Sequence, residues 1–181
     1  FPGAKTTLYD PGMKLPCIIK QPGRKMAGKV TDHLISWVDL APTILDYVGA
    51  FPSDNRFQGR SFRTSLEDPD GEGPSQVYAS HTFHEITMYY PMRVIRTHKW
   101  KFIYNLAWPL EYPSASDLWA SPTWQSAYKD GRKAMYGQRT IDAYLQRPRF
   151  ELYDIVPDPG ETKNIAYEQK YWEIVEGLKQ Q

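Results

Sequence analysis

Residues 150–166 read FELYDIVPDPGETKNIA, and this stretch decides how the C-terminal part of the chain folds. Its first six residues, 150–155, are rich in aliphatic and aromatic types that favour a β-strand. Pro157 and Pro159 have no N–H to offer a sheet, so the strand must end before them. The Asp-Pro-Gly run around Pro159 is typical of a turn, and residues 168–179 beyond it predict a terminal helix.

The residues before this stretch predict the rest of a small sheet. Three further strands are expected, at 76–81, 92–96 and 100–104. The last two are joined as a hairpin through Thr97-His98-Lys99. Residues 107–149 form a long aromatic insertion, with helical segments expected at 121–129 and 140–146. A few antiparallel strands backed by a C-terminal helix make an α+β arrangement, and this is the fold class that we expect.

The first 75 residues have a different character. Residues 38–48 carry apolar side chains at helical spacing, which predicts a helix with Asp39 as its N-cap and Gly49 as its stop. Residues 15–20 are an apolar run and predict a short buried strand. Residues 51–75 are rich in Pro, Gly, Asp and Ser, so we expect them to form a linker.

Composition narrows the class of partner. The chain has 181 residues and a net charge of +1, so its overall balance creates no field that would attract a polyanion such as nucleic acid. No apolar run approaches the ~20 residues of a membrane span. The single cysteine, Cys17, excludes an internal disulfide framework and leaves the compartment open. Within its apolar run it is expected to be a buried small hydrophobe.

Four segments resemble sulfatases of the alkaline-phosphatase superfamily, and they follow one another along the chain in the same order as in that family. Residues 150–166 have the form E-L-Y-D, a spacer, and D-P-x-E-x-x-N-x-A. FPGAKTTLYDPG (1–12) resembles a sulfatase stretch in which a lysine or arginine precedes T-x-x-Y, and LISWVDLAPTILDYVGA (34–50) resembles the D-L-x-P-T-x-L-D helix. Within residues 80–106, the run HEITMYYPMR resembles the narrower group of sulfamidases, the heparan N-sulfatases that cleave an N-sulfate from glucosamine.

The resemblance implies a division of a longer parent enzyme. Residues 1–50 would end the large α/β sulfatase domain, residues 51–75 would link the two parts, and residues 76–181 would form the C-terminal antiparallel-sheet subdomain. The chain would then begin just after a metal-binding Asp-Asn-Gly. By the same resemblance, the protein would be periplasmic, secreted or lysosomal.

The chemistry of the family implies two groups outside this chain. Sulfatases use a C/S-x-P-x-R motif whose cysteine or serine becomes formylglycine, together with several aspartates that hold calcium. Cys17 lacks this context, because no arginine stands at the expected position. We therefore expect formylglycine and calcium in a missing N-terminal catalytic domain, no metal ligand in this chain, and no activity from the chain alone.

The resemblance also assigns roles to residues of this chain. Lys5 would be the catalytic cation that contacts the sulfo group, since a compact point charge suits the negative charge held while the S–O or S–N bond breaks. His84 and Glu85 would bind the sugar, the first as a donor and the second as an acceptor. Arg93 would contact acidic sugar groups, or else form an ion pair within the sheet.

Alternatives remain open at this point. Within the superfamily, the parent would be an N-sulfatase, an O-sulfatase, or a phosphonate or phosphodiester hydrolase. From a different class, the chain would be a non-catalytic carbohydrate-binding module that stacks sugars on Trp108, Trp119 and Trp124, although large aromatic residues more often pack in a core.

Overall fold

The computed structural model describes residues 4–24, 26–54 and 56–181. Phe1, Pro2 and Gly3, which open the segment that resembles the sulfatase lysine loop, lie outside the described residues. The chain forms two compact units, one that joins the segment up to Leu15 to residues 79–181, and one of residues 16–78. The predicted domain boundaries concern the whole parent protein and stay a prediction.

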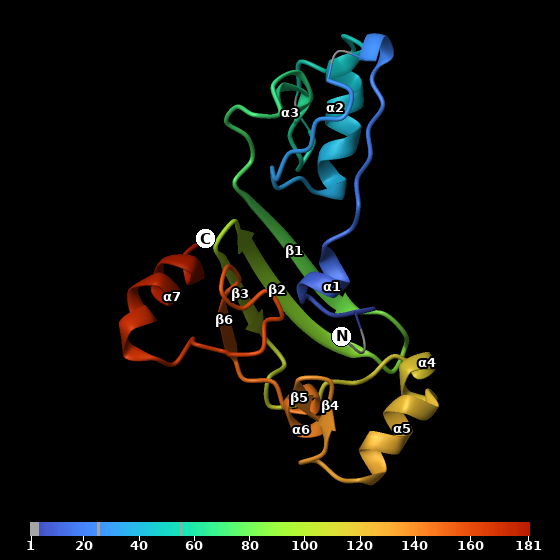
Figure 1. Ribbon diagram of the computed structural model, residues 1–181, viewed down its shortest axis with the longest axis vertical. Helices are drawn as coiled ribbons and strands as arrows, with labels where there is room; N and C mark the ends of the chain where they lie inside the picture. The colour runs from blue at the N-terminus through green and yellow to red at the C-terminus, as the bar shows by residue number, and fades with distance from the viewer. Residues whose placement is uncertain (1–3, 25, 55) are drawn as a thin grey trace. The chain divides into compact units, whose positions relative to one another are not determined.

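The larger unit is built on a four-stranded sheet (Figure 1). In sheet order its strands are β1 (Gln76–Phe83), β2 (Tyr89–Thr97), β3 (Trp100–Asn105) and β6 (Phe150–Asp154). Strand β3 pairs antiparallel with β2 and with β6, and this brings Ile95, Phe102 and Leu152 into one row. The α+β class, the hairpin and the strand at 150–155 are therefore confirmed.

One face of this sheet packs against the terminal helix. After the turn η3 (Gln169–Tyr171), α7 (Trp172–Lys179) places Val175 and Leu178 against the row that contains Phe102. All of these side chains are buried, so the apolar stripe of α7 and the apolar face of the sheet exclude water together. The predicted helix that backs the sheet is confirmed.

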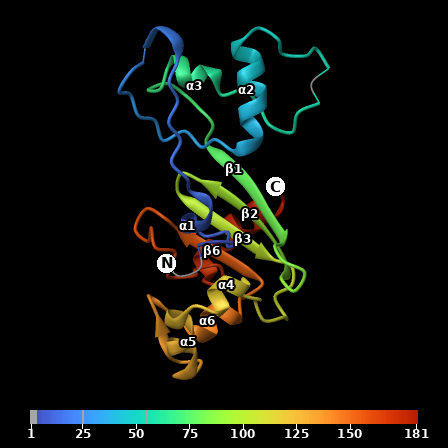
Figure 2. The ribbon, with the colours of Figure 1, turned by 90° about the vertical axis from the view of Figure 1, so that its right-hand side faces the viewer.

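The opposite face is covered by the N-terminal segment, which contains α1 (Asp10–Met13). In Figure 2, α1 lies in front of the strands. Leu8 and Tyr9 are buried there against Val94 and Ile103. A Cβ atom at Gly12 would lie 2.2 Å from the carbonyl oxygen of Ala4, so the tight return of this segment requires a glycine. Turn-forming residues such as Pro11 and Gly12 predict a loop over residues 1–14, and the helix α1 departs from that prediction.

The aromatic insertion forms a small core of its own. Its elements are α4 (Ser116–Trp119), α5 (Pro122–Lys129), β4 (Met135–Tyr136), β5 (Arg139–Thr140) and α6 (Ile141–Leu145). Trp124 is 1% exposed and packs edge-on against Tyr136 and Tyr144. Both predicted helices are confirmed, and Trp124 has a core role.

The smaller unit is organised around α2 (Leu40–Tyr47), which follows the turn η2 (Trp37–Asp39). The Asp39 carboxylate accepts hydrogen bonds from Ser36 N at 2.8 Å and Arg60 N at 3.0 Å, so it ties two segments together rather than capping α2. Asp39 does occupy the predicted N-cap position of α2, but its side chain makes no capping hydrogen bond to that helix. The helix ends before Gly49, whose φ of 71° suits a C-terminal stop.

The rest of this unit departs from the sequence prediction in two places. The stretch expected to be a linker contains α3 (Arg63–Glu67), and the turn η1 (Pro22–Arg24) lies earlier in the unit. Residues 15–20 form no strand, and Cys17 is exposed rather than buried. An apolar run becomes a buried strand only when a neighbour pairs with it. Pro16 withholds one N–H, and no described segment pairs with this run.

Candidate functional site

Lys5 lies in the segment before α1 and makes an ion pair with the insertion. Its Nζ atom is 2.8 Å from Oδ2 of Asp117, at the start of α4, and both side chains are more than half exposed. The hydrogen bond to Asp117 raises the pKa of Lys5, and the same bond lowers the pKa of Asp117. Lys5 is therefore a fully charged ammonium group that already holds an oxyanion at hydrogen-bond distance.

Glu85 reaches the same short helix from the turn between β1 and β2. Its Oε1 atom accepts hydrogen bonds from Ser116 Oγ at 3.0 Å and Ser116 N at 3.3 Å. The negative charge of Glu85 also contributes to the raised pKa of Lys5. The structure thus brings the two predicted residues Lys5 and Glu85 to adjacent positions of α4, Asp117 and Ser116.

His84 precedes Glu85 in this turn and is exposed. The turn is closed by hydrogen bonds from Met88 N to Glu85 O at 2.9 Å and from His84 N to Met88 O at 3.3 Å. Consecutive residues of a regular strand point to opposite faces, so joint use of His84 and Glu85 requires an irregular backbone. In the structure both residues lie in the turn after β1 rather than in a regular strand.

His81, by contrast, is half-buried on β1, where Nδ1 lies 3.4 Å from the Tyr90 carbonyl oxygen. Burial lowers the pKa of its imidazole, which keeps it neutral near pH 7. Its partner is the backbone of β2, which indicates a structural role.

Arg93 does not join this group. Along β2 it alternates with Met92 and Val94, which are buried on the face covered by the N-terminal segment, so Arg93 belongs to the α7 face. Its Nη1 atom donates to the Met92 carbonyl oxygen at 3.0 Å. The substrate contact predicted for Arg93 stays a prediction, without support from the position of the side chain.

Sequence reasoning missed the roles of Ser116 and Asp117. Neither residue lies in a segment that carries the family resemblance. A helix of four residues gives no periodic signal, and Lys5 and Asp117 are 112 residues apart in the chain. No local pattern could have joined them.

Buried polar contacts hold the segment that carries Lys5. Glu151 of β6 accepts hydrogen bonds from the Tyr9 hydroxyl at 2.7 Å, the Tyr153 hydroxyl at 2.5 Å and Asn105 Nδ2 at 2.7 Å. Burial is the largest cause of the raised pKa of Tyr9, and the Glu151 carboxylate adds to it. The phenol therefore stays protonated and continues to donate, which fixes Tyr9 to the sheet.

Asp10 is fixed by a second buried cluster. Its backbone N donates to Glu161 Oε2 at 2.6 Å, and its carboxylate pairs with Lys101 at 2.5 Å and with Arg96 at 3.2 Å. Burial acts to raise the pKa of Asp10, but the hydrogen bonds and charges of Arg96 and Lys101 outweigh it, so the pKa lies below its ordinary value. Glu161 keeps its place although its φ is 53°, in the left-handed region.

The stretch 150–166 therefore has a structural role, because its polar residues hold the sheet and the segment that carries Lys5 in place. Asn164 continues the hydrogen bonding of β6, since Leu152 N donates to its Oδ1 at 2.9 Å and its Nδ2 donates to Phe150 O at 3.0 Å. Together with Glu151 and Glu161, it supports the face on which the Lys5 segment lies.

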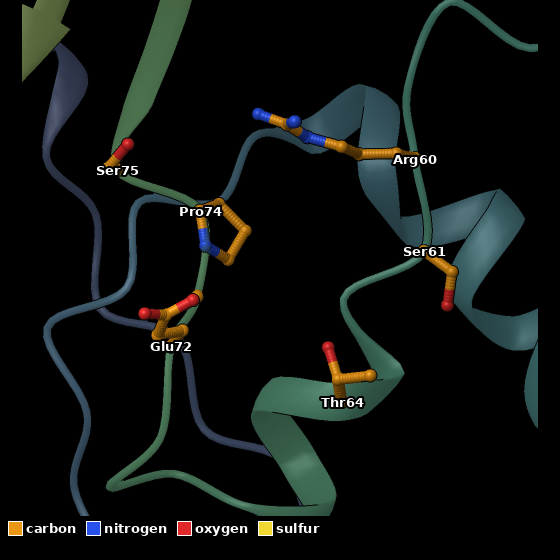
Figure 3. Close-up of a pocket in the computed structure, with 7 residues that line it drawn as sticks. Arg60, Ser61, Thr64, Glu72, Pro74 and Ser75 are labelled. Atoms are coloured by element: carbon orange, nitrogen blue, oxygen red, sulfur yellow. The ribbon is translucent and has the colours of Figure 1, made fainter.

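The smaller unit has a shallow polar hollow of about 310 Å³ (Figure 3). Its lining residues are Arg60, Ser61, Thr64, Glu72, Gly73, Pro74 and Ser75. None of the predicted site residues lines it, so it is separate from the group around Lys5.

The described residues contain neither a metal-binding cluster nor a membrane-spanning helix. Within residues 4–24, 26–54 and 56–181, no three His, Cys, Asp or Glu side chains gather in a way that could hold a metal ion. No helix in this part of the chain is both long enough and apolar enough to span a bilayer.

Comparison with known proteins assigns the chain to a family. Residues 4–134 match the family model described as N-sulphoglucosamine sulphohydrolase, C-terminal. The human N-sulphoglucosamine sulphohydrolase is 34% identical over 196 aligned residues, which cover 100% of this chain and 38% of that protein. An ulvan-active sulfatase of Formosa agariphila is 30% identical, with 96% of this chain and 33% of that protein covered.

A further relative, the N-acetylglucosamine-6-O-sulfatase of Bacteroides thetaiotaomicron, is 27% identical over 97% of this chain and 26% of its own length. The chain thus spans between about a quarter and two fifths of the relatives that it matches. Since the family model covers well over half of the residues, the chain belongs to the N-sulphoglucosamine sulphohydrolase C-terminal family of sulfatases.

Proposed function

We propose that the protein carrying this chain is a sulfatase that hydrolyses a sulfo group, N-linked or O-linked, from a glycosaminoglycan-type sugar such as heparan sulfate. The observation that carries the proposal is the exposed ion pair between Lys5 Nζ and Asp117 Oδ2 at 2.8 Å, beside Glu85. An ammonium group held in this way is preorganised to receive a sulfo oxygen in place of the carboxylate oxygen.

The chain's own residues would divide the work between charge and recognition. Lys5 would hold the charge that develops on the sulfo oxygens as the bond to sulfur breaks. Glu85 and His84, which share an exposed turn, would bind the hydroxyl or amino groups of the sugar. Relatives named for N-sulphoglucosamine and for N-acetylglucosamine-6-O-sulfate support a glucosamine unit.

Formylglycine would supply the nucleophile and calcium would offset negative charge in the whole enzyme. No acidic cluster in the described part of the chain fits calcium, and Cys17 does not fit the formylglycine motif, so we assign both groups to a catalytic domain outside these residues. We also propose a periplasmic, secreted or lysosomal location, in which the enzyme would meet extracellular glycans.

The test is sulfate release by the whole protein from glucosamine N-sulfate and glucosamine 6-O-sulfate. Lys5→Ala should lower kcat by roughly 10²–10³-fold, as the loss of a preorganised charged contact does. Lys14→Ala, which removes an exposed lysine of the same segment, should leave kcat unchanged. The isolated chain should release no sulfate.

Three results would contradict the proposal. Faster release of phosphate from a phosphodiester than of sulfate from either sugar would favour a phosphoryl-transfer enzyme. Binding of glycan by the isolated chain, without turnover by the whole protein, would favour a carbohydrate-binding module that uses exposed rings such as Trp108. Wild-type kcat in Lys5→Ala would remove Lys5 from the mechanism.

A further inference from the structure

Thr6, next to Lys5, has an unusual backbone conformation. Its φ is 69°, in the left-handed region that β-branched residues rarely adopt. Such a conformation costs on the order of 1–3 kcal/mol and persists only where surrounding contacts enforce it. Because Lys5 precedes this residue, the conformation of Thr6 affects where the Lys5 side chain can reach.

Thr6 lies in a turn that is closed by hydrogen bonds from Thr7 N and Thr7 Oγ1 to Ala4 O at 3.3 and 3.1 Å, and Tyr112, in the insertion, contacts this turn. The Tyr112 hydroxyl donates to the Thr6 carbonyl oxygen at 2.8 Å and lies 3.1 Å from Thr6 Oγ1. Thr6 Oγ1 in turn donates to the Lys5 carbonyl oxygen at 2.6 Å. One phenol therefore contacts both the backbone and the side chain of Thr6, whose hydroxyl binds Lys5.

Tyr112 is itself held rigidly. It is 4% exposed, its backbone N donates to Leu145 O at 2.7 Å, and its ring packs edge-on against Tyr90 with centroids 5.2 Å apart. The guanidinium carbon of Arg147 lies 3.4 Å from the centre of the Tyr112 ring. A ring enclosed in this way cannot move aside without breaking buried contacts, so it can fix a strained segment.

We propose that Tyr112 is a positioning residue for Lys5. Its hydroxyl holds residues 5 and 6 in the conformation that directs the Lys5 ammonium group to Asp117 and, during turnover, to the sulfo group. The proposal rests on the proposed function of Lys5. It gives the insertion two roles at the site, because Asp117 pairs with Lys5 and Tyr112 holds its backbone.

Tyr112→Phe in the whole protein tests this directly, because it keeps the ring and removes the hydroxyl. The loss of one hydrogen bond predicts a fall in kcat of about three- to tenfold on sulfated sugars. Tyr90→Phe is the matched control. Tyr90 touches Tyr112 and is 0% exposed, and its hydroxyl has no hydrogen-bond partner among the described residues. The control should keep the wild-type kcat.

A double-mutant cycle separates positioning from general support of the fold. If Tyr112 acts through Lys5, Tyr112→Phe should cost nothing further in a Lys5→Ala background. The same loss in both backgrounds, or no loss in either, would overturn the inference. Failure of the proposed function is distinct, because in that case Lys5→Ala alone would leave kcat unchanged.

Substitutions at Thr6 keep the inference testable even if Tyr112→Phe fails to fold. Thr6→Gly accepts a φ of 69° and keeps the carbonyl that Tyr112 binds, so it should retain most of the activity. Thr6→Pro fixes φ near −65° and should lower kcat toward the level of Lys5→Ala. Wild-type kcat in Thr6→Pro would show that this conformation does not position Lys5.

Discussion

The carboxylate of Glu161 lies 2.6 Å from the ammonium group of Lys101, and both side chains are almost completely shielded from solvent, with 1% and 0% exposed. Lys101 Nζ is also 2.5 Å from Asp10 Oδ1, so a single buried cation joins two carboxylates. One of these carboxylates follows β6 and the other begins α1. Lys101 therefore links the C-terminal stretch 150–166 to the segment that carries Lys5.

Lys101→Met should strongly destabilise the protein. Removing the cation leaves Glu161 and Asp10 facing each other, and breaking a buried pair in this way costs about 3–5 kcal/mol. Urea unfolding of the whole protein would measure the loss. Lys99→Met is the control from the same hairpin, because Lys99 is 57% exposed and lies 3.7 Å from its partner Asp154. An equally small effect of both substitutions would mean that the buried pair is not needed for stability.

Asp10 should make stability sensitive to acid. Its folded pKa lies below the ordinary value of 3.8, so its contribution is present above that pH and is lost as the pH falls through the folded pKa. Asp10→Asn should therefore flatten the decline in unfolding free energy below about pH 4. Asp130→Asn, at an exposed position, should leave the decline unchanged. An unaltered slope in Asp10→Asn would contradict the lowered pKa.

The sheet could be predicted from the sequence because its signals are local. Alternating apolar residues, the short turn at 97–99 and the prolines after β6 each act over a few positions. The buried cluster around Lys101 could not be predicted, because charged side chains are expected at the surface and Asp10 reaches Lys101 only in the folded chain. The strand predicted at residues 15–20 was wrong because an apolar run does not by itself supply a neighbouring strand to pair with.

The candidate site likewise contains residues that could be predicted from the sequence and residues that could not. Lys5, His84 and Glu85 follow from resemblance to a known motif, whereas Asp117 and Tyr112 meet Lys5 or its neighbour only through the fold. Arg93 shared the motif but lies on the other sheet face. Sequence motifs therefore identified the residue types, and side-chain direction decided which of them gather.

Asp117→Asn should increase the affinity of the site for anions. Asp117 pairs with Lys5, so under the proposed function a sulfo group or product sulfate would have to displace its carboxylate. Removing an exposed competing charge should lower the inhibition constant of inorganic sulfate by about two- to fivefold. Asp142→Asn, which breaks an exposed pair with Arg132 in the same insertion, should leave that constant unchanged. Weaker sulfate inhibition in Asp117→Asn would show that Asp117 assists anion binding instead.

His84→Ala and Glu85→Gln should discriminate between substrates. Both residues lie in the exposed turn before β2, where they would contact the sugar rather than the reacting sulfur. An unpaired polar group in the site lowers kcat/KM only for a substrate that made the contact. The loss should therefore be large for glucosamine N-sulfate and small for a simple aryl sulfate, which has no sugar groups.

The control for this prediction is Ile86→Ala in the same turn. Ile86 is 100% exposed, so its removal changes neither packing nor charge and should leave kcat/KM unchanged on both substrates. Equal losses on the sugar and on the aryl sulfate would mean that His84 or Glu85 acts in the common chemical step or maintains the turn. For Glu85 the second case can be recognised, because it would disturb the bond to Ser116 and lower the melting temperature. Unchanged kcat/KM on both substrates would exclude sugar contact by this pair.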